Sequence, residues 1–131
     1  MAPKIVDANV VLRYLLRDDE KLFQKSFALL EDVRTGSQTI IITESVLAEC
    51  VYVLMKVYGV DRAVISQKMD ELFSYRGVSN MDRDDLITAL QIFGETNLSI
   101  VDCVICSKAI NHGMPLVTFD EDLNAVYKKK S

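Results

Sequence analysis

Residues 4–16 read KIVDANVVLRYLL, and this stretch decides the fold that we predict. Its first three residues form a short apolar strand that stops at Asp7. The residues that follow place Val10, Val11 and Tyr14 on a helical repeat. The chain therefore opens with a strand, a turn and a helix, which is the repeating unit of α/β folds.

The same alternation of apolar strands and amphipathic helices continues along the chain. Further strands are predicted at 39–42 (TIII), 78–79, 98–101 (LSIV) and 115–119 (PLVTF). Helices are predicted from Asp18 or Asp19 to about Arg34, from Thr43 to about Tyr58, from Asp61, from about Asp82 to Glu95, over 103–113, and after Asp120. Because parallel neighbours need crossover helices, the pattern predicts an α/β fold with a central, mostly parallel sheet flanked by helices on both sides.

The composition fits a single globular domain over residues 1–131. With 50% hydrophobic residues the chain is long enough to bury one sizeable core. The net charge of -4 argues against a protein that holds nucleic acid by bulk positive charge, so a nucleic-acid role needs a local device such as a metal ion that bridges acids to a phosphate. No apolar run approaches the roughly 20 residues that span a bilayer, and no signal-peptide core is evident, so we expect a cytoplasmic protein.

The three cysteines and the one histidine are expected to be structural. Cys50, Cys103 and Cys106 lie in apolar surroundings, as buried thiols of a reducing compartment do. The C-x-x-C spacing of Cys103 and Cys106 also fits a redox pair or half of a zinc site, but no second pair follows, and this spacing is ordinary on one helix face. His112 precedes Gly113, and we expect it to end a helix rather than bind metal.

Three aspartates follow predicted strands. Asp7 follows KIV, Asp102 follows LSIV, and Asp120 follows LVTF. In parallel sheets ligands bind outside the carboxyl ends of the strands, so the loops there could bring the three side chains to one rim. The alternative is that each aspartate caps a helix, and one residue can serve both roles.

Glu49 is the only charged residue in the apolar run 46–55 (VLAECVYVLM). We expect this helix to be buried on most sides, and a buried carboxylate costs several kcal/mol unless it is paired, protonated or bound to a cation. The alternatives are a narrow solvent-exposed strip or an ion pair with an arginine. Together with the three aspartates, metal ligation is the better account. Glu44 is expected to complement the N-terminus of the same helix, with a substrate or partner contact as the alternative.

A cluster of carboxylates has a natural partner in a divalent cation. Carboxylates held close together raise one another's pKa, and a cation removes this penalty. Oxygen ligands favour Mg²⁺ or Mn²⁺ over zinc. Such an ion polarises a phosphoryl oxygen and lowers the pKa of a bound water, so phosphodiester hydrolysis would need no serine, histidine or cysteine nucleophile.

Four stretches resemble, in order and spacing, the motifs of PIN domains, and especially of the toxin nucleases of the VapC group. They are IVDANVVLRYLLRDD (5–19), ITESVLAECVYVL (42–54), LSIVDCVI (98–105) and LVTFDEDL (116–123). Residues from Tyr58 to about Glu95 match only by helix pattern. The resemblance implies a PIN-like fold, an acidic pocket for Mg²⁺ or Mn²⁺, and endonucleolytic cleavage of structured RNA such as tRNA or rRNA. It also implies a homodimer inhibited by an antitoxin protein that inserts into the pocket.

The resemblance also assigns site residues by position. The pocket acids would be Asp7, Glu49, Asp102 and Asp120. Small polar residues beside them would be Asn9 and Thr118. Asp122 would be an outer ligand through water, with an exposed acid in the first turn of a helix as the alternative.

Two further surfaces are assigned from helical spacing. Arg13 and Arg17 are four residues apart and could neutralise RNA phosphates, or could form a solvated, acid-paired face. A dimer interface is expected on the apolar face made by Ile65, Met69, Leu72 and Phe73.

Two other classes of protein remain as rivals. A non-catalytic PIN domain would bind RNA or dock a protein, but it has no physical need for a costly acid cluster. A phosphate-accepting receiver domain would carry paired acids after its first strand and a lysine after its last, and neither occurs at Asp7 or Asp120.

Overall fold

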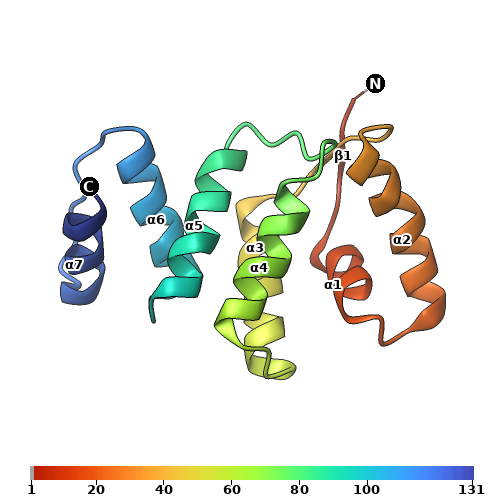
Figure 1. Ribbon diagram of the computed structural model, residues 1–131, viewed down its shortest axis with the longest axis horizontal. Coiled ribbons are helices and arrows are strands. Elements are labelled where there is room, and N and C mark those ends of the chain that lie inside the picture. The colour runs from red at the N-terminus through yellow and green to blue at the C-terminus, as the bar shows by residue number, and fades with distance from the viewer. Residues whose placement is uncertain (1) are drawn as a thin grey trace.

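Helices joined by short loops dominate the chain, and two very short strands lie near its N-terminal end (Figure 1). The computed structural model describes residues 2–131. The elements are β1 (Lys4–Ile5), α1 (Ala8–Leu16), α2 (Glu20–Thr35), β2 (Ile40–Ile41), α3 (Glu44–Tyr52), a π-helical turn (Val53–Val57), α4 (Arg62–Phe73), α5 (Arg83–Glu95), α6 (Ile100–Asn111) and α7 (Glu121–Lys130).

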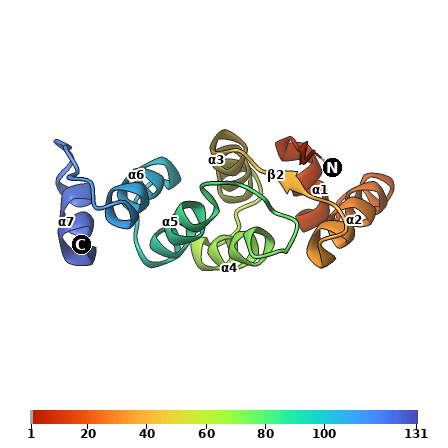
Figure 2. The same ribbon diagram turned by 90° about the horizontal axis from the view of Figure 1, so that it is seen from above.

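The two strands are parallel, as the sequence pattern predicts. Lys4 lies opposite Ile40 and Ile5 opposite Ile41, and a single bridge from Ile40 to Val78 extends the pairing. Seen from above, the strands lie between α2 and α3, and the later helices continue in a row away from them (Figure 2). The central sheet is therefore much smaller than expected.

Most helices begin at the residues that the sequence predicts as caps. The side chains of Asp7, Asp19, Thr43 and Asp120 each accept a hydrogen bond from the backbone amide three residues later, which satisfies one of the free donors at a helix start. Gly36 ends α2 with φ 90, a conformation that glycine adopts without strain. The predicted helix boundaries are confirmed here.

The long helix that begins after Thr43 changes from α-helical to π-helical geometry before it ends. After α3 the chain widens into the π-helical turn Val53–Val57, where the Tyr58 amide donates to the Val53 carbonyl at 3.2 Å. Gly59 then leaves the helix with φ 64. The predicted end near Tyr58 and Gly59 is confirmed, but the wide turn is not visible in the hydrophobic pattern.

Two predicted strands are absent among residues 2–131. Ile100 and Val101 already belong to α6, because the Ser99 side chain accepts from the Asp102 amide at 3.2 Å and starts the helix there. Residues 115–119 belong to no helix or strand, and Phe119 lies in a bend. The prediction of a strand at each place is wrong. An apolar, β-branched run forms a strand only where a neighbouring strand is within reach.

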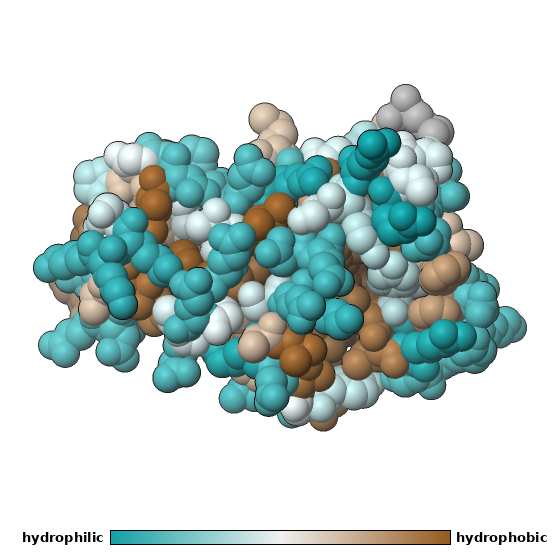
Figure 3. Space-filling model, viewed as in Figure 1, coloured by the Kyte–Doolittle hydropathy of each residue, from teal (hydrophilic) through white to brown (hydrophobic). Residues whose placement is uncertain are grey.

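The core runs through the whole row of helices. Ile65, Met69, Leu72 and Phe73 of α4 are at most 1% exposed and pack in this core, with α4 lying against α5. The prediction that this face lies at a dimer interface is wrong, because the same chain already covers it. On the face seen in Figure 3, apolar atoms reach the surface only in separate patches between hydrophilic side chains.

No helix within residues 2–131 has both the length and the apolar character that a membrane crossing requires.

Candidate active site

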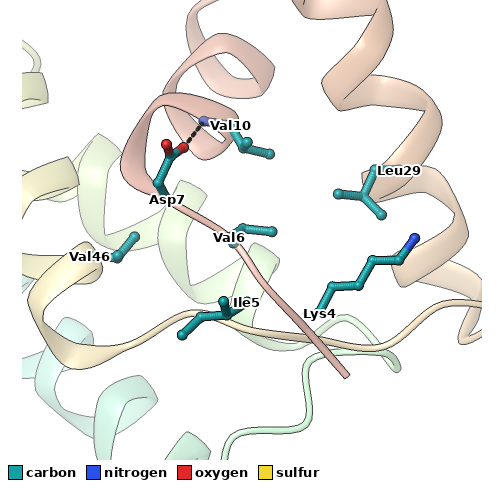
Figure 4. Close-up of a pocket in the computed structure, with 7 residues that line it drawn as sticks. All are labelled: Lys4, Ile5, Val6, Asp7, Val10, Leu29 and Val46. Atoms are coloured by element: carbon teal, nitrogen blue, oxygen red, sulfur yellow. Dashed lines mark hydrogen bonds between the residues drawn. The ribbon is translucent and has the colours of Figure 1, made fainter. Parts of the chain in front are cut away.

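Asp7 stands at the junction of β1 and α1. Its Oδ1 accepts a hydrogen bond from the Val10 amide at 3.1 Å, which caps the helix and fixes the carboxylate at its N-terminus (Figure 4). The side chain is exposed, and within residues 2–131 its second oxygen accepts no hydrogen bond. Capping therefore uses one oxygen and leaves the other free for a ligand. Asn9, in the first turn of α1, is also exposed.

Glu49 is exposed on α3, not buried as the sequence suggested. The apolar run around it packs inward through Leu47, Cys50 and Val51, and Glu49 occupies the remaining strip. Among the described residues it has no ion-pair partner. The argument from burial is thus wrong, and the exposed-strip alternative describes its place.

The Cys50 thiol, next to Glu49 in the sequence, contacts the residue that follows Asp7. The thiol is fully buried, with its Sγ 3.9 Å from the Ala8 carbonyl oxygen at the start of α1. Burial raises its pKa to about 12, and the negative charges of Glu49 and Asp7 both add to that rise. Asp7 and Glu49 therefore adjoin the place where α1 and α3 contact each other.

Asp102 lies on the first turn of α6 and is half-buried. Helix α6 packs against α3 as well as α5, and the Asp102 charge adds to the raised pKa of the neighbouring Cys103 thiol, which burial lifts to about 11. Burial also raises the pKa of Cys106. Thiols that resist ionisation are poor nucleophiles and poor metal ligands, so both cysteines act in packing.

Asp120 caps α7 at the other end of the molecule. Its Oδ1 accepts from the Leu123 amide at 2.9 Å, and its own amide donates to Thr118 Oγ1 at 3.0 Å. The exposed Asp122 follows in the first turn of α7 and borders a hollow shared with Leu98. Helix α7 packs on α6, and Figure 1 shows both on the side away from β1.

The acids of one chain do not form a complete cation site. Among residues 2–131 no three histidine, cysteine, aspartate or glutamate side chains lie close enough together to hold one metal ion. Asp7 and Glu49 adjoin the contact of α1 with α3, whereas Asp120 starts α7 beyond the intervening helices (Figure 1). The donor chemistry suits Mg²⁺ or Mn²⁺, but this arrangement does not.

Arg13, on α1, and Arg17, at its C-terminal end, both form ion pairs. Arg13 contacts Asp18 at 2.9 Å, and Arg17 contacts Glu20 at 3.2 Å. Asp7 begins α1 and Arg17 ends it, so the two are about 15 Å apart along the helix axis. Both arginines therefore have acidic partners, and their contact with RNA phosphates stays a prediction.

Sequence reasoning missed a polar pair between α5 and α6. Asp85 is only 6% exposed, and its carboxylate accepts from His112 Nε2 at 2.8 Å and from Asn111 Nδ2 at 2.9 Å. Burial alone would raise the Asp85 pKa, but the hydrogen bonds from His112 and Asn111 outweigh it and the pKa is lowered. The sequence did contain a signal for this cluster, because Asp85 lies on the apolar face of α5, the helix that also carries Ala89.

Asp7 follows a parallel strand, and both Asp7 and Asp120 begin helices, as ligand-binding acids of α/β domains do. The model of the PIN domain matches residues 4–129, and the chain therefore belongs to the PIN-domain family, with the α/β fold that this implies. PIN domains are generally nucleases. No curated protein and no solved structure matches the chain.

Proposed function

We propose that the protein is an endoribonuclease that requires Mg²⁺ or Mn²⁺. The observation that carries this proposal is the pair Asp7 and Glu49, two exposed acids whose neighbours in the sequence, Ala8 and Cys50, contact each other. Membership of a nuclease family and the order of the acids along the chain support it. In this proposal the order of the motifs adds Asp102, Asp120 and Asp122 to the site, although Asp120 and Asp122 lie away from Asp7 in this structure.

The role of these residues follows from their positions. The free oxygen of Asp7 and the unpaired carboxylate of Glu49 are available to a cation and, through it, to an RNA phosphate. Asn9 and Thr118 are proposed as polar contacts to substrate beside the first and last of these acids. A non-catalytic RNA-binding or docking module is the alternative, and it gives no reason for two exposed acids without ion-pair partners near the contact of α1 with α3.

RNA cleavage by the purified protein tests the proposal. We expect cleavage of a tRNA or rRNA mixture with Mg²⁺ or Mn²⁺ and none after EDTA, because carboxylates alone do not supply the positive charge that a phosphate needs. Undiminished cleavage in EDTA would contradict the metal requirement.

Two aspartates allow a matched comparison. Asp7 and Asp19 both cap helices with Oδ1, and asparagine caps about as well as aspartate. Asp7→Asn should abolish cleavage, and Asp19→Asn should preserve it, while both keep the thermal stability of the native chain. Equal activity of the two variants would remove Asp7 from the site.

We further infer that this nuclease is the toxin of a toxin–antitoxin pair and that an antitoxin protein covers the acidic edge. The resemblance of all four motifs to the VapC group supports this. Induced expression should arrest bacterial growth, and Asp7→Asn should relieve the arrest. Growth unaffected by the native chain would contradict the toxin role.

A further inference from the structure

The polar contacts between α5 and α6 border a hollow at the surface. The hollow has a volume of ≈ 430 Å³, which lies within the range of small-molecule sites in proteins. It is lined by Met81, Asp84, Asp85, Thr88, Asn111 and His112. None of these residues belongs to the proposed nuclease site, so the hollow is a separate feature of the molecule.

The hydrogen bond between Asp85 and His112 fixes the imidazole. The Asp85 carboxylate, whose pKa is lowered, is ionised at neutral pH and can only accept hydrogen bonds. His112 Nε2, at 2.8 Å from Asp85 Oδ2, must therefore carry a proton. In the neutral imidazole the other nitrogen, Nδ1, then has a lone pair. Within residues 2–131 this Nδ1 has no hydrogen-bond partner, so it is a free acceptor.

The side-chain amide of Asn111 is oriented by the same carboxylate. Its Nδ2 donates to Asp85 Oδ1 at 2.9 Å and to Thr88 Oγ1 at 3.3 Å, and these bonds use both of its N–H groups. Its Oδ1 can only accept, and it has no partner in the described part of the chain. Asn111 therefore offers a second free acceptor.

Asp84 adds a negative charge that no other side chain neutralises. It is exposed and has no ion-pair partner among the described residues. The charge of Lys108 helps to lower the Asp85 pKa, but Lys108 does not line the hollow. Its Nζ lies 3.5 Å from Glu44 and 3.8 Å from Asp82. The hollow thus combines negative charge with acceptors that lack a donor.

We propose that this hollow binds an organic cation with N–H donors, an alkylammonium or alkylguanidinium group. Such a group donates charge-assisted hydrogen bonds to the free acceptors and offsets the charge of Asp84. Met81, which is 105% exposed, supplies a flexible apolar side chain for the alkyl part of the ligand. A metal ion fits less well, because no three histidine, cysteine, aspartate or glutamate side chains within residues 2–131 lie close enough to hold one.

NMR of His112 tests the proposal on the native chain. His112 is the only histidine, so its imidazole proton signals report on the hollow without any substitution. At pH 8, chosen to keep the ring neutral, putrescine should shift these signals in a saturable way. Its hexamethylated analogue has the same chain and charge but no N–H donor, and it should not. No saturable shift with any N–H cation, or an equal shift with the analogue, would overturn the proposal.

Two sources carry this chemical group, a free polyamine and a basic side chain of another protein. A lysine peptide that is acetylated at its N-terminus and amidated at its C-terminus represents the second source. Binding of putrescine alone would identify a free cation as the ligand, and binding of the peptide alone would identify a side chain. A titration in which neither binds would overturn the proposal.

Two aspartate variants locate the binding. Asp84→Asn should weaken binding about tenfold, because a hydrogen bond to a charged group contributes about that factor. Asp61 is also exposed and has no ion-pair partner within residues 2–131, so Asp61→Asn removes the same charge outside the hollow and should leave binding unchanged. Equal binding by the two variants would overturn the proposal. Because no step uses RNA cleavage, the result is independent of the proposed function.

Discussion

Glu49→Gln and Glu44→Gln should separate catalysis from stability on one helix. Both glutamates are exposed on α3, and the substitution removes one negative charge with almost no change in size. If Glu49 holds a cation, Glu49→Gln should lower RNA cleavage by orders of magnitude. Glu44→Gln should leave cleavage nearly intact.

The stability changes follow from what each carboxylate contacts. Glu49 has no ion-pair partner among residues 2–131, so its loss should change the free energy of unfolding by less than about 0.5 kcal/mol. Glu44 lies in the first turn of α3 and contacts Lys108 Nζ at 3.5 Å. The charge at the helix start contributes about 0.3 to 1 kcal/mol, and the exposed ion pair adds little to it. The inactive variant should therefore be the more stable one.

The assay is RNA cleavage at saturating Mg²⁺ with thermal melts of the same samples in EDTA. A difference of 1 kcal/mol corresponds to about 3 to 5 °C for a chain of this size. Full cleavage by Glu49→Gln would refute its place in the site. A melting temperature lowered by many degrees would show a structural role that the exposed position of Glu49 does not explain.

Two further predictions concern stability alone. His112→Ala removes one of two hydrogen bonds to the buried Asp85 carboxylate and should cost about 1 to 3 kcal/mol in a denaturant titration at pH 7. The Asp85 pKa is lowered in the folded state, so the stabilisation from its carboxylate is present above pH about 4. This stabilisation is lost as the pH falls through the pKa of the folded state. The native chain should therefore lose more stability in acid than the His112→Ala variant. Gly77→Ala places a Cβ 2.0 Å from the Gln38 carbonyl oxygen and 2.8 Å from that of Val33, so the turn must shift at a cost of about 3 kcal/mol. A Gly77→Ala melting temperature equal to that of the native chain would contradict this packing.

Local features of the fold are predictable from the sequence because they depend on neighbours in the chain. Asp7, Asp19 and Thr43 cap helices where their side chains reach an amide three residues on, and Gly36 ends a helix by its own conformational freedom. These interactions can be predicted without knowledge of the tertiary structure. The strand at 4–6 was also correct because Ile40 and Ile41 are present to pair with it.

The failures concern interactions between distant segments. The segment 115–119 has the composition of a strand, but pairing depends on where the rest of the chain places an open edge. Glu49 was expected to be buried because the residues around it are apolar, yet a helix between two neighbours still leaves one strip exposed. Asp85 escaped notice because its partners, Asn111 and His112, lie 26 and 27 residues away.

The wide turn at Val53–Val57 bears on how relatives of this chain can differ in length. A π-helical turn is an α-helical turn that carries one additional residue, accommodated locally without displacing the helix before it. A homologue with a one-residue deletion here can therefore keep Glu49 on the same face of α3. It can also keep the N-cap of α4 at the position of Asp61. Alignments of this family should accept a single-residue gap between Tyr52 and Tyr58 where they would otherwise misplace the acidic residue on α3.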